Sequence, residues 1–155
     1  PPQQLVGIGF AAQGVFVGEV YQRICFEPAF DWVFNGINDD VIGDFGFSGN
    51  GAAGFELDHV DPALDNGLDI TILAQSFGDS FMLVPEEQLT HLTNLSGDSE
   101  AQAKRADMVY AKTPSGGEVF AVGPITFSGS LPWNKFDNNV SRLLRNVVNR
   151  FVGAS

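Results

Sequence analysis

Between residues 140 and 151, apolar side chains recur at the spacing of one face of an α-helix. They occupy positions i, i+3, i+4, i+7, i+8 and i+11, namely Val140, Leu143, Leu144, Val147, Val148 and Phe151. Asp137 or Asn138 can cap the first amides, Arg150 lies in the last turn, and Gly153 follows it. The pattern predicts a terminal amphipathic helix whose apolar face packs on something large, most simply a sheet.

Shorter apolar runs predict strands ahead of this helix. Residues 5–10 indicate a short buried strand, residues 69–74 a central strand, and residues 81–84 a strand or a helix broken at Pro85. Two runs, 108–112 and 118–122, flank a five-residue turn rich in Pro and Gly, which predicts a β-hairpin. Residues 125–128 are expected to extend the β region.

Residues 11–66 are rich in Gly, Asp, Asn and Phe and keep no sustained period of 3.6 or 2. A structureless loop of that length is unusual in a compact domain, so we interpret it as a long functional loop region with short strands. Together with the strands and the terminal helix, the residues support an α/β or an α+β fold. The length of 155 residues is that of one ordinary domain.

Charge is unevenly distributed, and it excludes some functions. The net charge is −11, and residues 1–100 hold one basic side chain, Arg23, against sixteen acidic ones. Residues 101–155 hold seven basic residues against three acids. An acidic front half repels phosphate backbones, so we expect no nucleic-acid partner. The acidity is typical of a solvated surface; alternatively, the basic tail docks on an acidic surface within its own assembly.

A few features of the sequence bear on the cellular location and processing of the chain. No apolar run approaches the ~20 residues that cross a bilayer, so no membrane partner is expected. The chain begins at Pro1 without a visible signal peptide, which suggests a processed or truncated chain. A single cysteine, Cys25, excludes an internal disulfide and fits a reducing, cytoplasmic compartment.

One dense cluster of acid–base or metal-ligating side chains comprises Glu56, Asp58, His59 and Asp61. With His91 it could supply a two-histidine, one-carboxylate iron site, although 31 residues separate the histidines and leave the geometry open. A calcium loop over Asp61, Asp65 and Gly67 lacks the alternating acidic spacing, and Pro62 interrupts it. The alternative is a polar loop with aspartate caps and turns.

Glu56 is distinct within this cluster. It lies between Phe55 and Leu57, directly after a glycine-rich turn. A carboxyl drawn into an apolar environment has a raised pKa and can serve as a general base near neutral pH. The alternative is that Glu56 points to solvent.

Other motifs favour structural roles. Residues 49–54 match the dinucleotide fingerprint literally, but three carboxylates and Pro62 follow where a helix should begin. These glycines are better explained by close approach of the backbone. Cys25 has no nearby histidine and is interpreted as a small interior residue. Ser48, Ser128 and Ser130 lack the G-x-S-x-G turn of a nucleophile. The phenylalanines indicate core, or a pocket for a small, weakly polar substrate.

Two anchors carry a resemblance to a known family. Residues 107–110 through 137–142, together with residues 41–46 running into 51–58, resemble the C-terminal part of the large (beta) subunit of N,N-dimethylformamidases. No single short motif carries the resemblance; the order and spacing of several stretches do. It covers nearly the whole chain, yet only the last part of a family member. Residues 1–155 would therefore be a single domain or the C-terminal part of a larger α/β catalytic domain.

The resemblance implies an α/β fold with a layered sheet and helices similar to class I glutamine amidotransferases. It implies an amidohydrolase that cleaves the C–N bond of small formamides such as N,N-dimethylformamide to formate and dimethylamine. The expected partners are the amide substrate, the upstream part of the large subunit, a small helical subunit and further copies in an oligomer. The family's Fe(III) is held by two tyrosines and a glutamate in upstream segments. Tyr21 and Tyr110 are therefore not expected to bind iron, and no metal or cofactor ligand is assigned within this chain.

One functional position transfers from the resemblance. The family carries an acidic residue near the iron in a Gly-Phe-Glu-x-Asp stretch, which residues 54–58 match, so Glu56 is the candidate catalytic base. Three departures put the substrate in question: His59 stands where the family usually has Arg, and Trp133 and Phe136 where it tends to have His and Tyr. Two other functions stay open, a non-catalytic scaffold or assembly domain of the same fold, and an acidic module that binds cations or carbohydrate.

Overall fold

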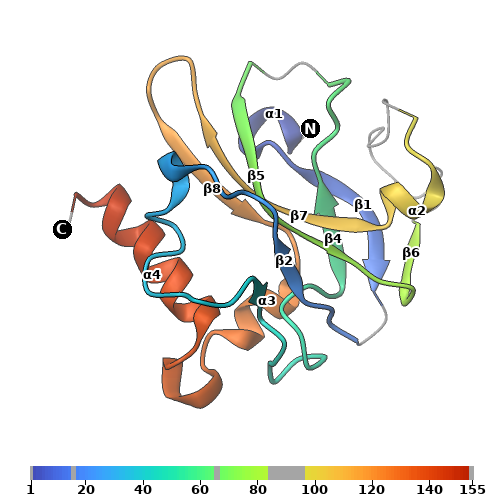
Figure 1. Cartoon of the computed structure of the whole chain (residues 1–155). Coiled ribbons are helices and arrows are strands. Elements are labelled where there is room, and N and C mark those ends of the chain that lie inside the picture. The colour runs from blue at the N-terminus through green and yellow to red at the C-terminus, as the bar shows by residue number, and fades with distance from the viewer. Residues whose placement is uncertain (1, 15–16, 65–66, 84–96, 154–155) are drawn as a thin grey trace.

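A computed structural model of the chain describes residues 2–14, 17–64, 67–83 and 97–153 (Figure 1). Its elements in chain order are α1 (Gln3–Val6), β1 (Gly9–Gly14), β2 (Tyr21–Arg23), η1 (Pro28–Phe30), β3 (Val41–Ile42), β4 (Glu56–His59), β5 (Asp69–Phe77), β6 (Phe81–Leu83), α2 (Glu100–Ala103), β7 (Arg105–Lys112), β8 (Glu118–Val122), α3 (Ile125–Ser130), η3 (Trp133–Phe136) and α4 (Asn139–Phe151). None of the helices in the described ranges is long and apolar enough to cross a membrane.

The strands form two sheets. The larger sheet has the order β3-β2-β5-β7-β8, and the smaller one the order β4-β1-β6. Every pairing between the described strands is antiparallel. The mixed helix and strand content is as predicted, and antiparallel pairing places it in the α+β arrangement, one of the two alternatives that the residues left open. The amidotransferase-like layering stays a prediction.

One apolar core joins the two sheets. The strand β7 is buried from Arg105 to Ala111 and lies against β4 of the smaller sheet (Figure 1). Leu57 of β4 and Phe81 of β6 share a hydrophobic cluster with Leu73 of β5 and Met108 of β7. The core therefore fixes β4, the strand that carries the candidate residues, against the middle of the larger sheet.

The predicted hairpin and central strand are confirmed. Residues 108–112 and 118–122 pair in antiparallel register from Met108↔Val122 to Lys112↔Glu118. β5 lies in the middle of the larger sheet and extends three residues beyond the predicted range. Both outcomes follow from apolar runs that were bounded by clear turn signals.

Two strand predictions are wrong. Residues 125–128 belong to helix α3, which begins after Pro124 and turns Thr126, Phe127 and Ser130 into the interior. Pro124 is the N-cap residue of α3 and has no backbone N–H to pair in a sheet, so it marks a boundary at the start of this short run. Within residues 5–10, Leu5 and Val6 form the end of helix α1, which Gly7 caps with φ +86°. The strand β1 begins only at Gly9.

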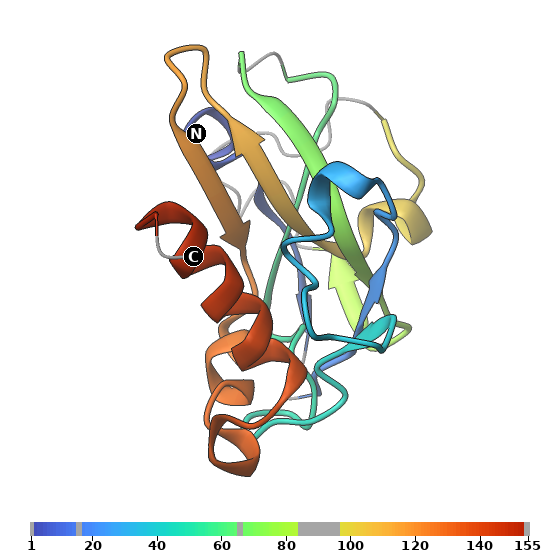
Figure 2. The same ribbon diagram turned by 60° about the vertical axis from the view of Figure 1, so that its left-hand side comes forward.

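The terminal helix α4 is confirmed. The Asn138 side chain accepts a hydrogen bond from the amide of Ser141, at 2.8 Å, and so caps the helix. Val140, Leu143 and Val147 are buried in the common core, whereas Val148 and Phe151 at the far end are exposed. The helix lies along the segment that joins β2 to β3 (Figure 2), and Asn146 donates to the carbonyls of that segment.

Candidate functional site

Strand β4 presents two carboxyls on one face. Burial alternates along it, with Leu57 and His59 buried, Glu56 exposed and Asp58 half-buried. Because successive side chains of a strand point to opposite faces, Glu56 and Asp58 project from the same face. β4 is an edge strand of the smaller sheet, paired on one side with β1. We call Glu56 and Asp58 the carboxyl pair.

The chain enters β4 through a crowded, strained segment. Phe55, immediately before Glu56, has φ +67°, a left-handed conformation that is unusual for a bulky residue and is often found at functional sites. Just upstream, the backbones of Gly51 and Gly18 approach so closely that a Cβ on Gly51 would come within 2.4 Å of the Gly18 carbonyl oxygen. The interpretation of these glycines as a close backbone approach is confirmed. Gly54 leads into a strand instead of a helix, so residues 49–54 lack the helix N-terminus that the dinucleotide fingerprint requires.

Asp58 differs from the other acids in its surroundings. Among the residues that the structure describes, no hydrogen bond or ion pair reaches its carboxyl, which lies against Gly123 after β8. A Cβ at position 123 would come within 2.0 Å of Asp58 Oδ2. Burial, and then the nearby Glu56 carboxyl, raise the pKa of Asp58 from 3.8 to about 6. The sequence placed Asp58 in the predicted acid–base cluster but assigned the buried environment to Glu56.

Glu56 itself is exposed, which corrects the expectation that it is drawn into an apolar environment. The physical reason is the pleat: Leu57 takes the inward position, so its neighbour must face outward. The buried, base-like environment predicted for Glu56 is found two residues further along, on the same face. A Glu-x-Asp spacing at the start of a strand is the signal that could have identified Asp58.

Two buried hydroxyls near this strand have no hydrogen-bond partner in the described structure, those of Tyr21 and Thr126. Burial raises the pKa of Tyr21 well above its ordinary value of 10.0, and Asp107 and Asp58 raise it further. Thr126 lies against Gly54, the residue before Phe55. Buried polar groups without partners are rare in folded proteins and call for an explanation.

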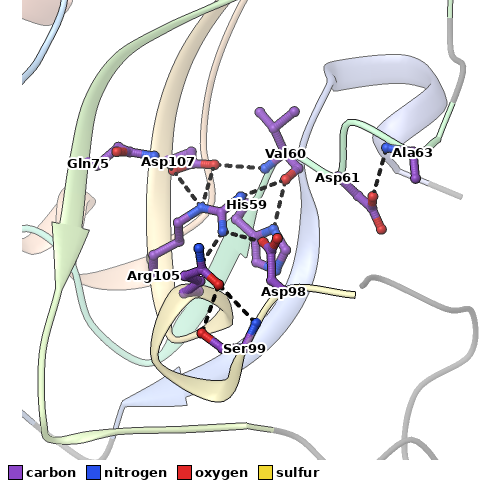
Figure 3. Close-up of polar contacts among 10 residues, drawn as sticks. His59, Val60, Asp61, Ala63, Gln75, Asp98, Ser99, Arg105 and Asp107 are labelled. Atoms are coloured by element: carbon purple, nitrogen blue, oxygen red, sulfur yellow. Dashed lines mark hydrogen bonds and ion pairs between the residues drawn. The ribbon is translucent and has the colours of Figure 1, made fainter. Parts of the chain in front are cut away.

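By contrast, the side of β4 that leads to Val60 adjoins a fully paired polar network (Figure 3). Asp107, which is completely buried, accepts hydrogen bonds from the Val60 amide at 2.8 Å, from Gln75 Nε2 at 2.9 Å and from Arg105 Nε at 3.2 Å. Arg105 also donates to Asp98 at 2.7 Å and to the Val60 carbonyl at 2.8 Å. Burial opposes the charge on Arg105, but Asp107 and Asp98 outweigh it, so its pKa is raised. We call these residues the Arg105 network.

The rest of the predicted cluster does not join the carboxyl pair. His59 is buried on the opposite face of β4, and its Nδ1 lies 2.9 Å from the Val60 carbonyl oxygen. Asp61 accepts a hydrogen bond from the Ala63 amide, as a turn residue does. His91 and Asp65 lie outside the described residues.

The same geometry bears on whether the described residues could hold a metal ion. In ranges 2–14, 17–64, 67–83 and 97–153, no group of three or more His, Cys, Asp or Glu side chains is arranged to hold a metal ion. The described residues therefore do not form an iron site by themselves. Tyr110 is packed edge-on against Phe30 and Trp32, and burial followed by Glu118 raises its pKa to about 12.

Two of the residues that were predicted to be structural, Cys25 and Ser130, lie in the interior. Cys25 is buried, which confirms its interpretation as a small interior residue. Ser130 donates to the Phe45 carbonyl at 2.7 Å and is also buried, so it supports packing between α3 and the segment after β3. Ser128 is exposed on α3.

One of the two aromatic residues that were expected to depart from the family, Trp133, lies at a surface groove of about 560 Å³. Trp133 lines the groove and contacts Phe45 and Phe47, with ring centroids 6.0 and 5.1 Å apart. Phe136, beside it in sequence, is 57% exposed. The groove is also lined by acids and amides: Asp39, Asp44, Asp137, Asn134, Asn138 and Asn139.

The segment that presents Trp133 is locally unusual. Three consecutive residues, Asn134, Lys135 and Phe136, have φ of 47°, 56° and 68°. Left-handed conformations normally occur singly in L-residues because the Cβ crowds the following carbonyl. Hydrogen bonds between Asn134 and Asp137, in both directions at 3.0 and 3.1 Å, close this turn.

Comparison with known proteins places the chain in a family. The family described as "N,N-dimethylformamidase beta subunit-like, C-terminal" matches residues 1–139. The N,N-dimethylformamidase beta subunit of an Alcaligenes species is 39% identical over 124 residues, which are 78% of this chain and 16% of that relative. The N,N-dimethylformamidase beta subunit of Paracoccus aminophilus matches with the same identity and coverage. The resemblance recognised in the sequence is confirmed: the chain belongs to the N,N-dimethylformamidase beta subunit-like, C-terminal family.

Proposed function

We propose that this chain supplies one wall of the active site of an amide hydrolase of the dimethylformamidase kind. The chain matches only 16% of each relative's length, so the complete protein would contribute the remaining walls. In this proposal the complete protein is a larger assembly that contains upstream segments, a small helical subunit and further copies. The Fe(III) expected from the resemblance would be held by those upstream segments.

The observation that supports the proposal is the presentation of Glu56. It is an exposed carboxyl on an edge strand, directly after the strained Phe55, in a segment whose glycines are pressed against neighbouring backbone. A strained conformation persists only where surrounding structure enforces it, and such sites cluster where a side chain must be aimed. An exposed, aimed carboxyl can reach a substrate that the described residues do not enclose.

The chemistry assigned to Glu56 is general base catalysis of amide hydrolysis. Its carboxylate takes a proton from water as the water oxygen bonds to the formamide carbonyl carbon. The C–N bond then breaks, and the departing nitrogen takes the proton back from Glu56. N,N-dimethylformamide and water give formic acid, which ionises to formate, and dimethylamine. Glu56 ends in its starting state, so the step balances without another reactant.

The test is dimethylamine release from dimethylformamide by the complete protein and its Glu56→Gln variant. The amide keeps the size of the side chain but cannot take the proton, so kcat should fall by roughly 10²-fold or more. Glu27→Gln, at an exposed position outside the site, is the matched control and should keep full turnover. Equal turnover in wild type and Glu56→Gln, with assembly intact, would remove Glu56 from the reaction and favour the scaffold function.

A second candidate function is supported by the groove. Exposed aromatic rings beside carboxylates are typical of sites that bind cationic or sugar ligands. We infer this alternative from the aromatic departures at Trp133 and Phe136, which the hydrolase proposal does not use. Calcium or oligosaccharide titration of the wild-type chain and of Trp133→Ala would favour it if binding occurs and is lost in the variant.

A further inference from the structure

The groove that Trp133 lines offers a ligand aromatic faces and negative charge together. It is formed by the segments on either side of β3, by η3 and by the start of α4. Phe47 is 70% exposed and Trp133 is 38% exposed, and their ring centroids lie 5.1 Å apart. Phe45 stacks on Trp133 with an interplanar angle of 18°. The faces of such rings attract a cation that lies within about 6 Å of the ring centroid.

Three carboxylates line the groove, those of Asp39, Asp44 and Asp137, and all three residues are exposed. Within the described residues, no hydrogen bond or ion pair reaches these carboxyls. Two cations are close by: Arg142 lines the adjoining pocket and Lys135 belongs to η3, but neither lines the groove itself. The lining therefore carries three negative charges and no positive one, in a chain whose net charge is −11.

The side-chain amides of the groove are already engaged with the backbone. Asn134, Asn138 and Asn139 each donate to backbone carbonyls, at distances between 2.7 and 3.0 Å. Asn138 and Asn139 also accept from the backbone amides of Ser141 and Gly43. The free groups of the groove are then mainly carboxylates, which accept hydrogen bonds but do not donate them. A sugar presents hydroxyls that both donate and accept, so this lining suits a cation better than a sugar.

A bare metal ion also fits the groove poorly. In the part of the chain that the structure describes, which includes the three aspartates, no group of three His, Cys, Asp or Glu side chains is arranged to hold a metal ion. Calcium takes about six to eight oxygen ligands, so it needs carboxyls that converge on one point. Carboxylates that are spread around aromatic rings suit a larger cation with a partly apolar surface.

We propose that this groove binds small alkylammonium cations, whose alkyl groups pack on Trp133 and Phe47 while the aspartates balance their charge. This inference rests on the second candidate function and narrows it, since it commits the groove to an organic cation in place of calcium or a sugar. It does not require Glu56 to be a base. Dimethylamine, the product of the proposed hydrolysis, belongs to the same class of ligand once it is protonated.

The test compares the binding of choline and of 3,3-dimethylbutan-1-ol to the complete protein. The two probes have nearly the same shape, but the alcohol has a carbon atom in place of the charged nitrogen. A ligand-observed NMR titration gives both dissociation constants, because it measures weak binding. Choline should bind roughly fivefold more tightly than the alcohol, which is the effect of one exposed cation–π contact. The affinity for choline should also fall as salt is added, because the aspartates are exposed.

Substitutions locate the site. Trp133→Ala and Phe47→Ala each remove one ring and should weaken choline binding by roughly two- to fivefold, and Trp133→Phe, which keeps a ring, should weaken it less. Asp44→Asn should weaken the binding of choline and leave that of the alcohol unchanged. Phe26→Ala removes a ring that is 60% exposed and lies outside the groove, so it is the matched control and should bind choline as the wild type does. Phe47→Ala carries the test if Trp133→Ala does not fold.

The outcomes distinguish this inference from the functions proposed above. Equal binding of choline and the alcohol would overturn it, because the charge would then not be recognised. Unchanged choline binding in both Trp133→Ala and Phe47→Ala would overturn it as well, because the site would lie elsewhere. Binding of calcium or an oligosaccharide at the groove, without binding of choline, would overturn it and leave the second candidate function standing. Binding of none of these ligands would overturn both, and the hydrolase proposal would still depend on its own test with Glu56→Gln.

Discussion

The two sides of strand β4 place buried acids in opposite circumstances. Asp107, beside Val60, is fully buried and receives hydrogen bonds from a guanidinium, an amide side chain and a backbone amide. Asp58 is less buried, yet no hydrogen bond or ion pair reaches its carboxyl within the described residues, and a second carboxyl lies beside it. Burial without a hydrogen-bonding or charged partner, and then the neighbouring Glu56 carboxyl, raise the pKa of Asp58 to about 6.

This contrast separates a structural site from the proposed functional one. The Arg105 network ties β7 to β5, to the segment after β4 and to the segment before α2, so it positions three parts of the fold at once (Figure 3). Within the described residues no hydrogen bond or ion pair joins the carboxyl pair to another element, and the raised pKa of Asp58 means that its charge costs stability. Unfavourable arrangements of this kind are retained where activity needs them. We therefore expect changes in the network to destabilise the chain and changes in the pair to stabilise it.

The largest effect should come from Arg105→Met. Methionine fills similar space but leaves Asp107 buried and without its cation, so the free energy of unfolding should fall by about 3–5 kcal/mol. Urea unfolding of the chain, followed by circular dichroism, measures it. Arg145→Met, on the exposed side of α4, is the control and should change the free energy by less than about 0.5 kcal/mol. Similar losses in both variants would contradict the structural role of the network.

Asp58→Asn should act in the opposite direction and depend on pH. The folded-state pKa of about 6 lies above the ordinary value of 3.8, so folding favours the protonated acid. The stability of the wild type is fully present near pH 4 and is lost as pH rises through 6, by roughly 3 kcal/mol at most. The variant lacks this loss, so it should be more stable than wild type by about 1–2 kcal/mol at pH 7.5, and nearly equal at pH 4.

The measurement is urea unfolding at a series of pH values between 4 and 7.5, with Asp79→Asn as the control. The control carries an exposed acid and should follow the wild type throughout. A variant that is less stable than wild type at pH 7.5 would show that Asp58 has a favourable partner, and the contrast between the two sides of β4 would be lost.

Much of the fold could be predicted from the sequence where the spacing of apolar residues and the turn residues indicated the same element. The hairpin of β7 and β8, the central strand β5 and the capped helix α4 each combine a clear pattern with a clear boundary. The errors at residues 5–10 and 125–128 arose where a proline or glycine that bounds a helix lies in or beside a short apolar run. In each of these segments the boundary signal proved stronger.

Less of the candidate site could be predicted from the sequence. The resemblance identified Glu56, and its catalytic role stays a prediction. Its exposure and the burial of Asp58 depend on which face of β4 meets the core, and two alternating faces look alike in a four-residue run. The contact of Asp58 with Gly123 joins residues 65 positions apart, and no local pattern encodes it. Nor does the sequence indicate that Arg105 pairs with Asp107 instead of Asp58.

The smallest effect should come from a buried hydroxyl without a partner. Tyr21 Oη makes no hydrogen bond in the described structure, whereas the hydroxyl of Ser130 donates to the Phe45 carbonyl at 2.7 Å. Removing a satisfied buried hydroxyl loses a bond and exposes an unpaired acceptor, so Ser130→Ala should lower the free energy of unfolding by about 1 kcal/mol. Tyr21→Phe removes an unsatisfied group of the same kind and should leave stability unchanged or raise it by up to about 1 kcal/mol. Thermal unfolding of both variants at pH 7 decides between them: if Tyr21→Phe is the more damaging change, the Tyr21 hydroxyl has a partner, and the interior beside Asp58 is better paired than its geometry indicates.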